Sequence, residues 1–164
     1  MKLRILIICL TTITVMNSCK KDAPAASSST TTDTKTALLC GKNWMMTAFT
    51  VNPGIDYYGT GTLLTNLYGT LQPCEANNLI NFSTNNSYTI DEGATKCTAG
   101  ASQTFETGTW AFNSDKTHLL MTETGSSTAD DYTIVSLTET SAQLTQTVVA
   151  GGITYVYTET FTKQ

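Results

Sequence analysis

The chain has 164 residues and a formal net charge of −4, and 40% of its residues are hydrophobic. Residues 37–164 hold four lysines, no arginine and eleven acidic residues, which gives this part a net charge of −7. A surface of this charge repels phosphate groups, so nucleic acid is excluded as a partner.

The N-terminus carries the pattern of an export signal. Lys2 and Arg4 precede a mostly apolar segment over residues 5–16, and Cys19 follows shortly after it. This segment is shorter than a membrane-spanning helix, which needs roughly 20 residues. A basic start followed by a short apolar centre is typical of a secretory signal peptide, so we expect residues 1–18 to be removed.

Residues 16–19, Met-Asn-Ser-Cys, resemble the lipobox of bacterial lipoproteins, in which Leu is more usual than Met16. The resemblance implies that Cys19 becomes the lipidated N-terminus and carries acyl chains such as palmitate. It further implies anchoring to the outer membrane of the cell envelope, facing the periplasm or the exterior. The alternative is an ordinary secreted protein in which Cys19 happens to lie near the cleavage site.

A change of composition separates this anchor from the rest of the chain. Residues 20–36 consist almost entirely of Ala, Pro, Ser, Thr, Lys and Asp. Because such a segment buries too little apolar surface to fold, we expect residues 19–36 to be the lipidated cysteine and a flexible tether. Residues 37–164 then suit one domain with its own core.

Thr, Tyr, Val and Ile are frequent in this domain, which indicates an all-β fold. Turn signals recur at short spacing, and the segments between them are predicted strands. They cover residues 43–51, 78–83, 87–92, 106–112, 117–123, 131–137, 142–150 and 153–162. Eight strands joined mostly by short turns favour a single antiparallel up-and-down β-barrel, with a two-sheet β-sandwich as the alternative.

The connection over residues 52–77 is long for such a domain. It contains Leu63 and Leu67, which would share one side of a predicted helical turn. Two interpretations remain open: a lid over one end of the barrel, or a packed surface loop.

One predicted hairpin has a register that can be tested. A three-residue loop that ends at Asn86 places Phe82 opposite Tyr88 and Ile80 opposite Ile90, so the apolar residues share a face. This loop requires Asn86 in the left-handed region, which Asn tolerates better than most residues.

The last hairpin turns at Gly151-Gly152, since glycine adopts positive φ without a steric penalty. The predicted register pairs Leu144 with Glu159 and continues in steps of two toward the turn. One face then collects the apolar residues and is expected to be the interior, together with two polar residues. This face consists of Leu144, Gln146, Val148, Ile153, Tyr155, Tyr157, Glu159 and Phe161.

Three cysteines remain beyond Cys19. Cys74 and Cys97 flank one predicted hairpin, and an exported protein is expected to form a disulfide, so we predict this pair. Cys40 is left over and is predicted to be a buried small hydrophobe rather than a reactive thiol. A metal site is not expected, because the chain has one histidine and no Cys-x-x-Cys pattern.

Three segments, LLCGKNWMM, CEANNLINFSTNNSYTIDEGATKC and TGTWAF, resemble the lipocalin-like domain of bacterial envelope lipoproteins. The resemblance covers the chain from about Leu38 to its C-terminus and implies an eight-stranded barrel. Lipocalins carry Gly-x-Trp at the first strand, whereas two residues separate Gly41 from Trp44 here, and no arginine follows near the last strand.

Small barrels are either filled by side chains or hold one small ligand. The aromatic and polar side chains of the predicted interior are candidates for binding an apolar or amphipathic molecule, and the same set would also suit a solid core. The candidates are Trp44, Phe82, Tyr88, Trp110, Gln146, Tyr155, Tyr157 and Glu159. His118 is the only histidine and has no recognisable nucleophile motif, so neither catalytic residues nor a cofactor are expected.

Two functions therefore remain in view. The first is a lipid-anchored binding protein of the envelope that holds a small molecule without catalysis. The second is a structural or protein-interaction lipoprotein whose barrel is filled.

Overall fold

A computed structural model describes residues 33–164. The predicted signal peptide, Cys19 and residues 20–32 lie outside the described residues. Among the described residues, no helix has the length and apolar character needed to cross a membrane.

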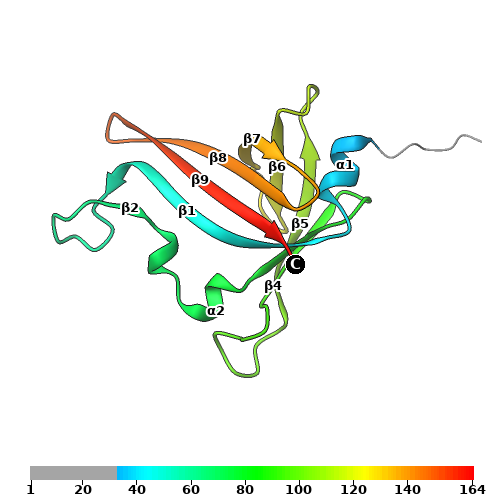
Figure 1. The fold of residues 1–164 in the computed structure, drawn as a ribbon, viewed down its shortest axis with the longest axis horizontal. Helices are drawn as coiled ribbons and strands as arrows, with labels where there is room; N and C mark the ends of the chain where they lie inside the picture. The colour runs from blue at the N-terminus through cyan, green and yellow to red at the C-terminus, as the bar shows by residue number, and fades with distance from the viewer. Residues whose placement is uncertain (1–32) are drawn as a thin grey trace, which may run out of the picture. The chain divides into compact units, whose positions relative to one another are not determined.

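The described chain forms one antiparallel sheet that closes into a barrel (Figure 1). The barrel strands are β1 (Asn43–Ile55), β3 (Leu79–Phe82), β4 (Ser87–Asp91), β5 (Thr104–Phe112), β6 (His118–Glu123), β7 (Asp130–Leu137), β8 (Ser141–Ala150) and β9 (Ile153–Lys163). Each strand pairs with the next, and β1 also pairs with β9, which closes the ring. The prediction of an eight-stranded barrel is confirmed, and the β-sandwich alternative is wrong.

Strand β1 closes the barrel because it is long enough to pair with several neighbours. Its first residues pair with β3, and its pairing with β9 extends from Trp44 opposite Lys163 to Asn52 opposite Val156. An irregularity between Met46 and Ala48 bends the strand along this edge, as β-bulges do. The short outer strand β2 (Leu64–Asn66) pairs with the far part of β1.

The predicted register of the first hairpin is confirmed. Phe82 lies opposite Tyr88, and Ile80 lies opposite Ile90. Asn86 has φ 68°, which is the left-handed conformation that the three-residue loop requires. The apolar residues of β3 and β4 therefore share the face that points into the barrel.

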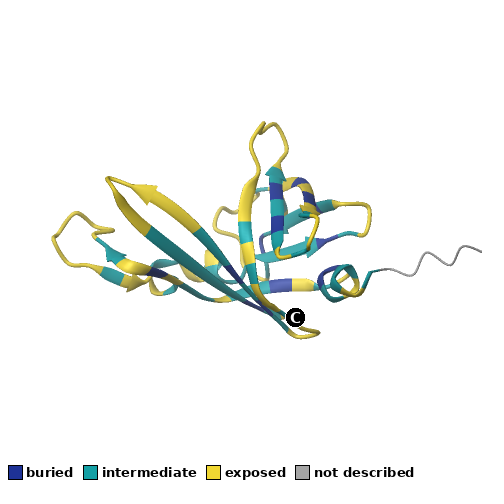
Figure 2. Ribbon diagram, turned by 90° about the horizontal axis from the view of Figure 1, so that it is seen from above, coloured by how far each residue is buried: buried dark blue, intermediate teal, exposed yellow. Residues whose placement is uncertain are grey.

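The register of the last hairpin is also confirmed, with Leu144 opposite Glu159 and a turn at Gly151-Gly152. However, β8 and β9 extend beyond their neighbours, and the tip of this hairpin is exposed (Figure 2). Val148 and Ile153 are exposed there, so their predicted place in the interior is wrong. The reason is that β7 pairs with β8 only as far as Thr145, so no further strand covers the apolar side of the tip.

The described domain begins with helix α1 (Thr34–Leu39), which starts inside the segment expected to be a tether. The Asp33 side chain caps this helix by accepting a hydrogen bond from the Thr36 backbone N at 3.2 Å. At the other end of the helix, Leu39 is buried in the core. Residues 34–36 of the expected tether thus belong to this helix.

The long connection contains β2, the 3₁₀-helix η1 (Tyr68–Thr70) and the short helix α2 (Pro73–Ala76). The predicted helical turn is wrong: Leu63 is exposed and Leu67 is buried, with the extended strand β2 between them. The predicted disulfide is confirmed, since Cys74 in α2 is bonded to Cys97. Cys40 is a buried free thiol within the core, as predicted.

Candidate functional site

The barrel encloses a cavity of about 260 Å³. All eight barrel strands and the end of α1 contribute side chains to its wall. Most of these side chains are apolar, and the larger ones include Trp44, Phe82, Met121 and Leu144. The interior is therefore not completely filled by side chains.

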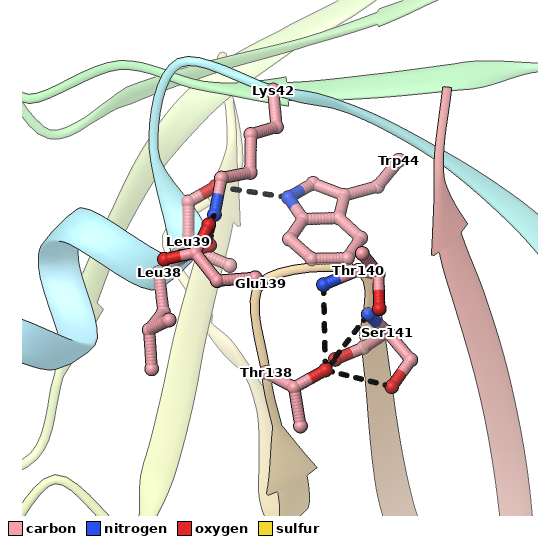
Figure 3. Close-up of polar contacts among 8 residues, drawn as sticks. All are labelled: Leu38, Leu39, Lys42, Trp44, Thr138, Glu139, Thr140 and Ser141. Carbon is pink, nitrogen blue, oxygen red and sulfur yellow. Dashed lines mark hydrogen bonds and ion pairs between the residues drawn. The ribbon is translucent and has the colours of Figure 1, made fainter.

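Trp44 and Leu39, the last residue of α1, line one end of this cavity. Figure 3 shows the contacts between them. Trp44 is only 1% exposed, and its indole Nε1 donates a hydrogen bond to the backbone O of Leu39 at 2.9 Å. Lys42 Nζ donates to the backbone O of Leu38 at 2.9 Å and pairs with Glu139 Oε2 at 2.9 Å. These contacts hold α1 against the barrel, so this end is a floor built from the first helix and the first strand.

The turn between β7 and β8 lies beside the same floor. Thr138 Oγ1 accepts hydrogen bonds from the backbone N of Ser141 at 3.0 Å and of Thr140 at 3.4 Å (Figure 3). Leu137 and Ala142, on either side of this turn, both line the cavity. The turn thus fixes two apolar residues of the floor.

One wall of the cavity is aromatic. The Phe82 ring centroid lies 6.2 Å from that of Tyr88 and 5.9 Å from that of Trp110, and Trp110 is 5.3 Å from Phe112. Trp110 is buried in the core next to this wall, and its Nε1 donates to the backbone O of Ser83 at 3.0 Å. Such contacts restrain the rings and make this wall a defined surface.

Two tyrosines, Tyr88 and Tyr132, line the cavity. The Tyr88 hydroxyl donates a hydrogen bond to Glu106 Oε1 at 2.7 Å. Burial, together with this hydrogen bond, raises the pKa of Tyr88 well above its usual range. Burial and the negative charge of Glu159 likewise raise the pKa of Tyr132. Both hydroxyls therefore stay protonated at neutral pH, and the proton of the Tyr88 hydroxyl is already donated to Glu106.

Glu159 is a half-buried carboxyl group in the wall of the cavity. Burial raises the pKa of its carboxyl group to about 7, and the negative charge of Asp130 adds to the effect. Within the described residues, the Glu159 carboxylate forms no hydrogen bond and no ion pair. Near neutral pH, protonated and ionised forms of this group are both populated.

The structure brings together four of the eight predicted site residues. Trp44, Phe82, Tyr88 and Glu159 line the cavity. Trp110 does not line the cavity but packs against Phe82 and Phe112, which do, and the other three residues also lie outside the lining. These are Gln146, whose amide donates to Asp130 Oδ1 at 3.4 Å, Tyr155 on the hairpin extension, and Tyr157, whose ring packs 6.0 Å from that of Phe49.

Sequence reasoning missed the acidic and tyrosine groups Glu106, Asp130 and Tyr132, which line the cavity. A usable signal was present in the strand alternation. Glu106 lies on the same face of β5 as Trp110. Asp130 and Tyr132 are two residues apart on β7 and therefore share a face as well.

A second cavity of about 290 Å³ adjoins the first and shares Met46, Ile80, Ile90 and Phe161 with it. Leu71 and Glu75, from the connection after β1, line its other side. The connection therefore covers this part of the barrel interior, and the disulfide at Cys74 attaches it.

His118 lies outside both cavities. Its Nδ1 is 2.6 Å from Asp131 Oδ1, at a partly exposed position on the outer face. Over residues 33–164, no group of three or more His, Cys, Asp or Glu side chains is placed to hold a metal ion.

The family model described as "Lipocalin-like domain" matches residues 39–144, about two-thirds of the chain. The matched region extends from the end of α1 into β8. Strand β9, which follows it, completes the ring by pairing with both β8 and β1. No curated protein matches the chain.

Proposed function

The chain belongs to the lipocalin-like family, and from this premise we propose that it is a lipid-anchored envelope lipoprotein whose barrel binds a small apolar or amphipathic molecule without catalysis. Barrels of this family typically bind small hydrophobic ligands. The observation that carries the binding proposal is the cavity of about 260 Å³ inside the barrel. The alternative, a structural lipoprotein, predicts a barrel filled by side chains and therefore does not account for this cavity.

The size of the cavity suggests the size of the ligand. An apolar protein cavity of roughly 150 Å³ binds benzene, which has six heavy atoms. By proportion, a cavity of about 260 Å³ holds on the order of ten heavy atoms. Apolar walls with a few polar groups are the usual form of a small-molecule site.

The arrangement of reactive groups supports binding rather than catalysis. No serine, cysteine or histidine lines the first cavity within the described chain. His118 is paired with Asp131 on the outer face and does not line the cavity. Nucleophilic catalysis requires a nucleophile and a base within hydrogen-bond reach of each other.

The anchoring part of the proposal rests on residues 1–19, with their basic start, short apolar segment and Cys19. It is tested by growing cells with a palmitate analogue that can be labelled. We expect label on the wild-type protein and none on the Cys19→Ala variant. Labelling of both proteins to the same extent would contradict lipidation at Cys19.

The binding part is tested by isothermal titration of the purified protein with 1-octanol. We expect saturable binding that is lost in Leu144→Trp, because the larger side chain occupies the cavity. Val149→Trp is the matched control, since Val149 is 68% exposed at the hairpin tip and that variant should still bind. Circular dichroism establishes that both variants are folded. Absence of 1-octanol binding by the wild-type protein would contradict the proposal.

A further inference from the structure

The two ends of the cavity differ in chemistry. At the floor, Ala142 on β8 lies opposite Phe161 on β9, next to Leu137. One step of two residues along the hairpin, Leu144 lies opposite Glu159. Farther in this direction, Gln146 contacts Asp130 at the start of β7. The cavity thus changes from apolar at α1 to acidic at the other end.

Strand β5 has the same polarity. Phe112 lies opposite Leu119, near the floor, whereas Glu106 is near the start of the strand, at the acidic end. Three carboxyl groups, those of Glu106, Asp130 and Glu159, therefore line one end of the cavity. No lysine, arginine or histidine lines it within the described chain.

The three carboxyl groups differ in their partners. Glu106 accepts a hydrogen bond from the Tyr88 hydroxyl, and Asp130 accepts one from the Gln146 amide. Glu159 lines the cavity, and within residues 33–164 its carboxyl group has no hydrogen-bond donor and no ion-pair partner. Glu159 is half-buried, and moving a carboxylate partly out of water is unfavourable unless an opposite charge or a hydrogen-bond donor compensates it. A cation bound in the cavity would supply that opposite charge.

We propose that the cavity selects molecules with an apolar body and a cationic head, such as an alkylammonium ion, with the apolar part against Trp44 and Leu144 and the charge beside Glu159. This inference rests on the proposed binding function and assigns its ligand class. A fatty-acid carboxylate is disfavoured, because its negative charge would lie among three carboxyl groups. A neutral alcohol fits the apolar part but leaves the Glu159 charge uncompensated.

Cation binding should depend on pH through Glu159. The other titratable groups that line the cavity are Tyr88 from β4, Glu106 from β5, and Asp130 and Tyr132 from β7. The residue opposite Glu159 on β8 is the apolar Leu144. Burial raises the pKa of Glu159 to about 7, so the carboxyl group loses its proton between pH 6 and pH 8. Affinity for a permanent cation should rise over this interval.

The test is isothermal titration at pH 8 with three probes that share an eight-carbon chain: octyltrimethylammonium, 1-octanol and octanoate. We expect the cation to bind at least tenfold more tightly than 1-octanol, and octanoate to bind most weakly. The advantage of the cation should shrink at pH 6. Equal affinity for the three probes would overturn the charge selectivity and leave the binding function intact, whereas no binding of any probe would contradict both.

Two variants locate the selectivity. Glu159→Gln keeps the size of the side chain and removes its charge, so the cation should lose its advantage while 1-octanol still binds. Asp130→Asn should reduce the same advantage to a smaller extent. Glu123→Gln is the matched control, because Glu123 is exposed on β6 and does not line the cavity. An undiminished cation preference in Glu159→Gln would overturn the inference.

Discussion

Replacing Glu159 by Gln tests the electrostatics of the barrel interior through stability alone, without any ligand. The folded state raises the pKa of this carboxyl group from 4.5 to about 7, mainly by burial. The folded protein therefore binds a proton more tightly than the unfolded chain does. The contribution of Glu159 to stability is fully present below pH 4.5 and is lost as the pH rises through 7.

The magnitude follows from the two pKa values. One pKa unit corresponds to about 1.4 kcal/mol, so the interval from 4.5 to about 7 corresponds to about 3 kcal/mol. The wild-type protein should lose this amount of stability from Glu159 between pH 4.5 and pH 8. The Glu159→Gln variant cannot lose it, because glutamine does not titrate.

Urea denaturation of both proteins at several pH values, followed by circular dichroism, measures the effect. Subtracting the free energy of unfolding of one protein from that of the other cancels the other titrating groups. The variant should gain up to about 3 kcal/mol relative to the wild type on going from pH 4.5 to pH 8. A difference between the two proteins that stays constant over this range would refute the reasoning about Glu159.

Three further substitutions test the structural account by thermal or denaturant unfolding. Gly108→Ala should lower the free energy of unfolding by about 1–3 kcal/mol. The added Cβ would overlap a backbone oxygen of β6 and lie 2.5 Å from an aromatic carbon of Tyr88 on β4. An unchanged Tm would contradict this packing. Replacing Cys74 and Cys97 by Ser should cost about 3 kcal/mol, since the disulfide closes a loop of some two dozen residues. Trp44→Phe loses the hydrogen bond to Leu39, so stability should fall by about 1 kcal/mol and amide exchange in α1 should become faster; unchanged exchange would show that α1 is held otherwise.

Local chemistry was sufficient to predict the register of two hairpins. Asn86 and Gly151-Gly152 accept positive φ, and each turn then determines which residues lie opposite one another. The pairs Phe82 with Tyr88 and Leu144 with Glu159 follow from these turns. The disulfide was predictable for the same reason, because its cysteines flank a hairpin of known register.

The extent of burial was not predictable from alternation. Val148 and Ile153 belong to the expected face but are exposed, because strands β8 and β9 extend past their neighbours. Strand length relative to adjacent strands is a property of the whole barrel. Leu63 and Leu67 show the same limit, since only the tertiary pairing of β2 with β1 separates their environments.

The candidate site was predicted in part. Aromatic residues such as Trp44 and Tyr88 were assigned to the interior by hydrophobicity, and they do line the cavity. Glu106 and Asp130 were missed because acidic residues near strand ends usually face water. Their convergence with Glu159 arises from three strands that are distant in sequence and become neighbours around one cavity only when the sheet closes.

The central claim is that a small molecule occupies the interior of this barrel. Intermolecular nuclear Overhauser effects between bound 1-octanol and the methyl groups of the protein test it most directly. The account predicts contacts from the alkyl chain to Met46, Ile134 and Leu144, which line the cavity, and none to Val149 at the exposed hairpin tip. Contacts to Val149 with none to the other three would place the ligand on the surface and contradict the account.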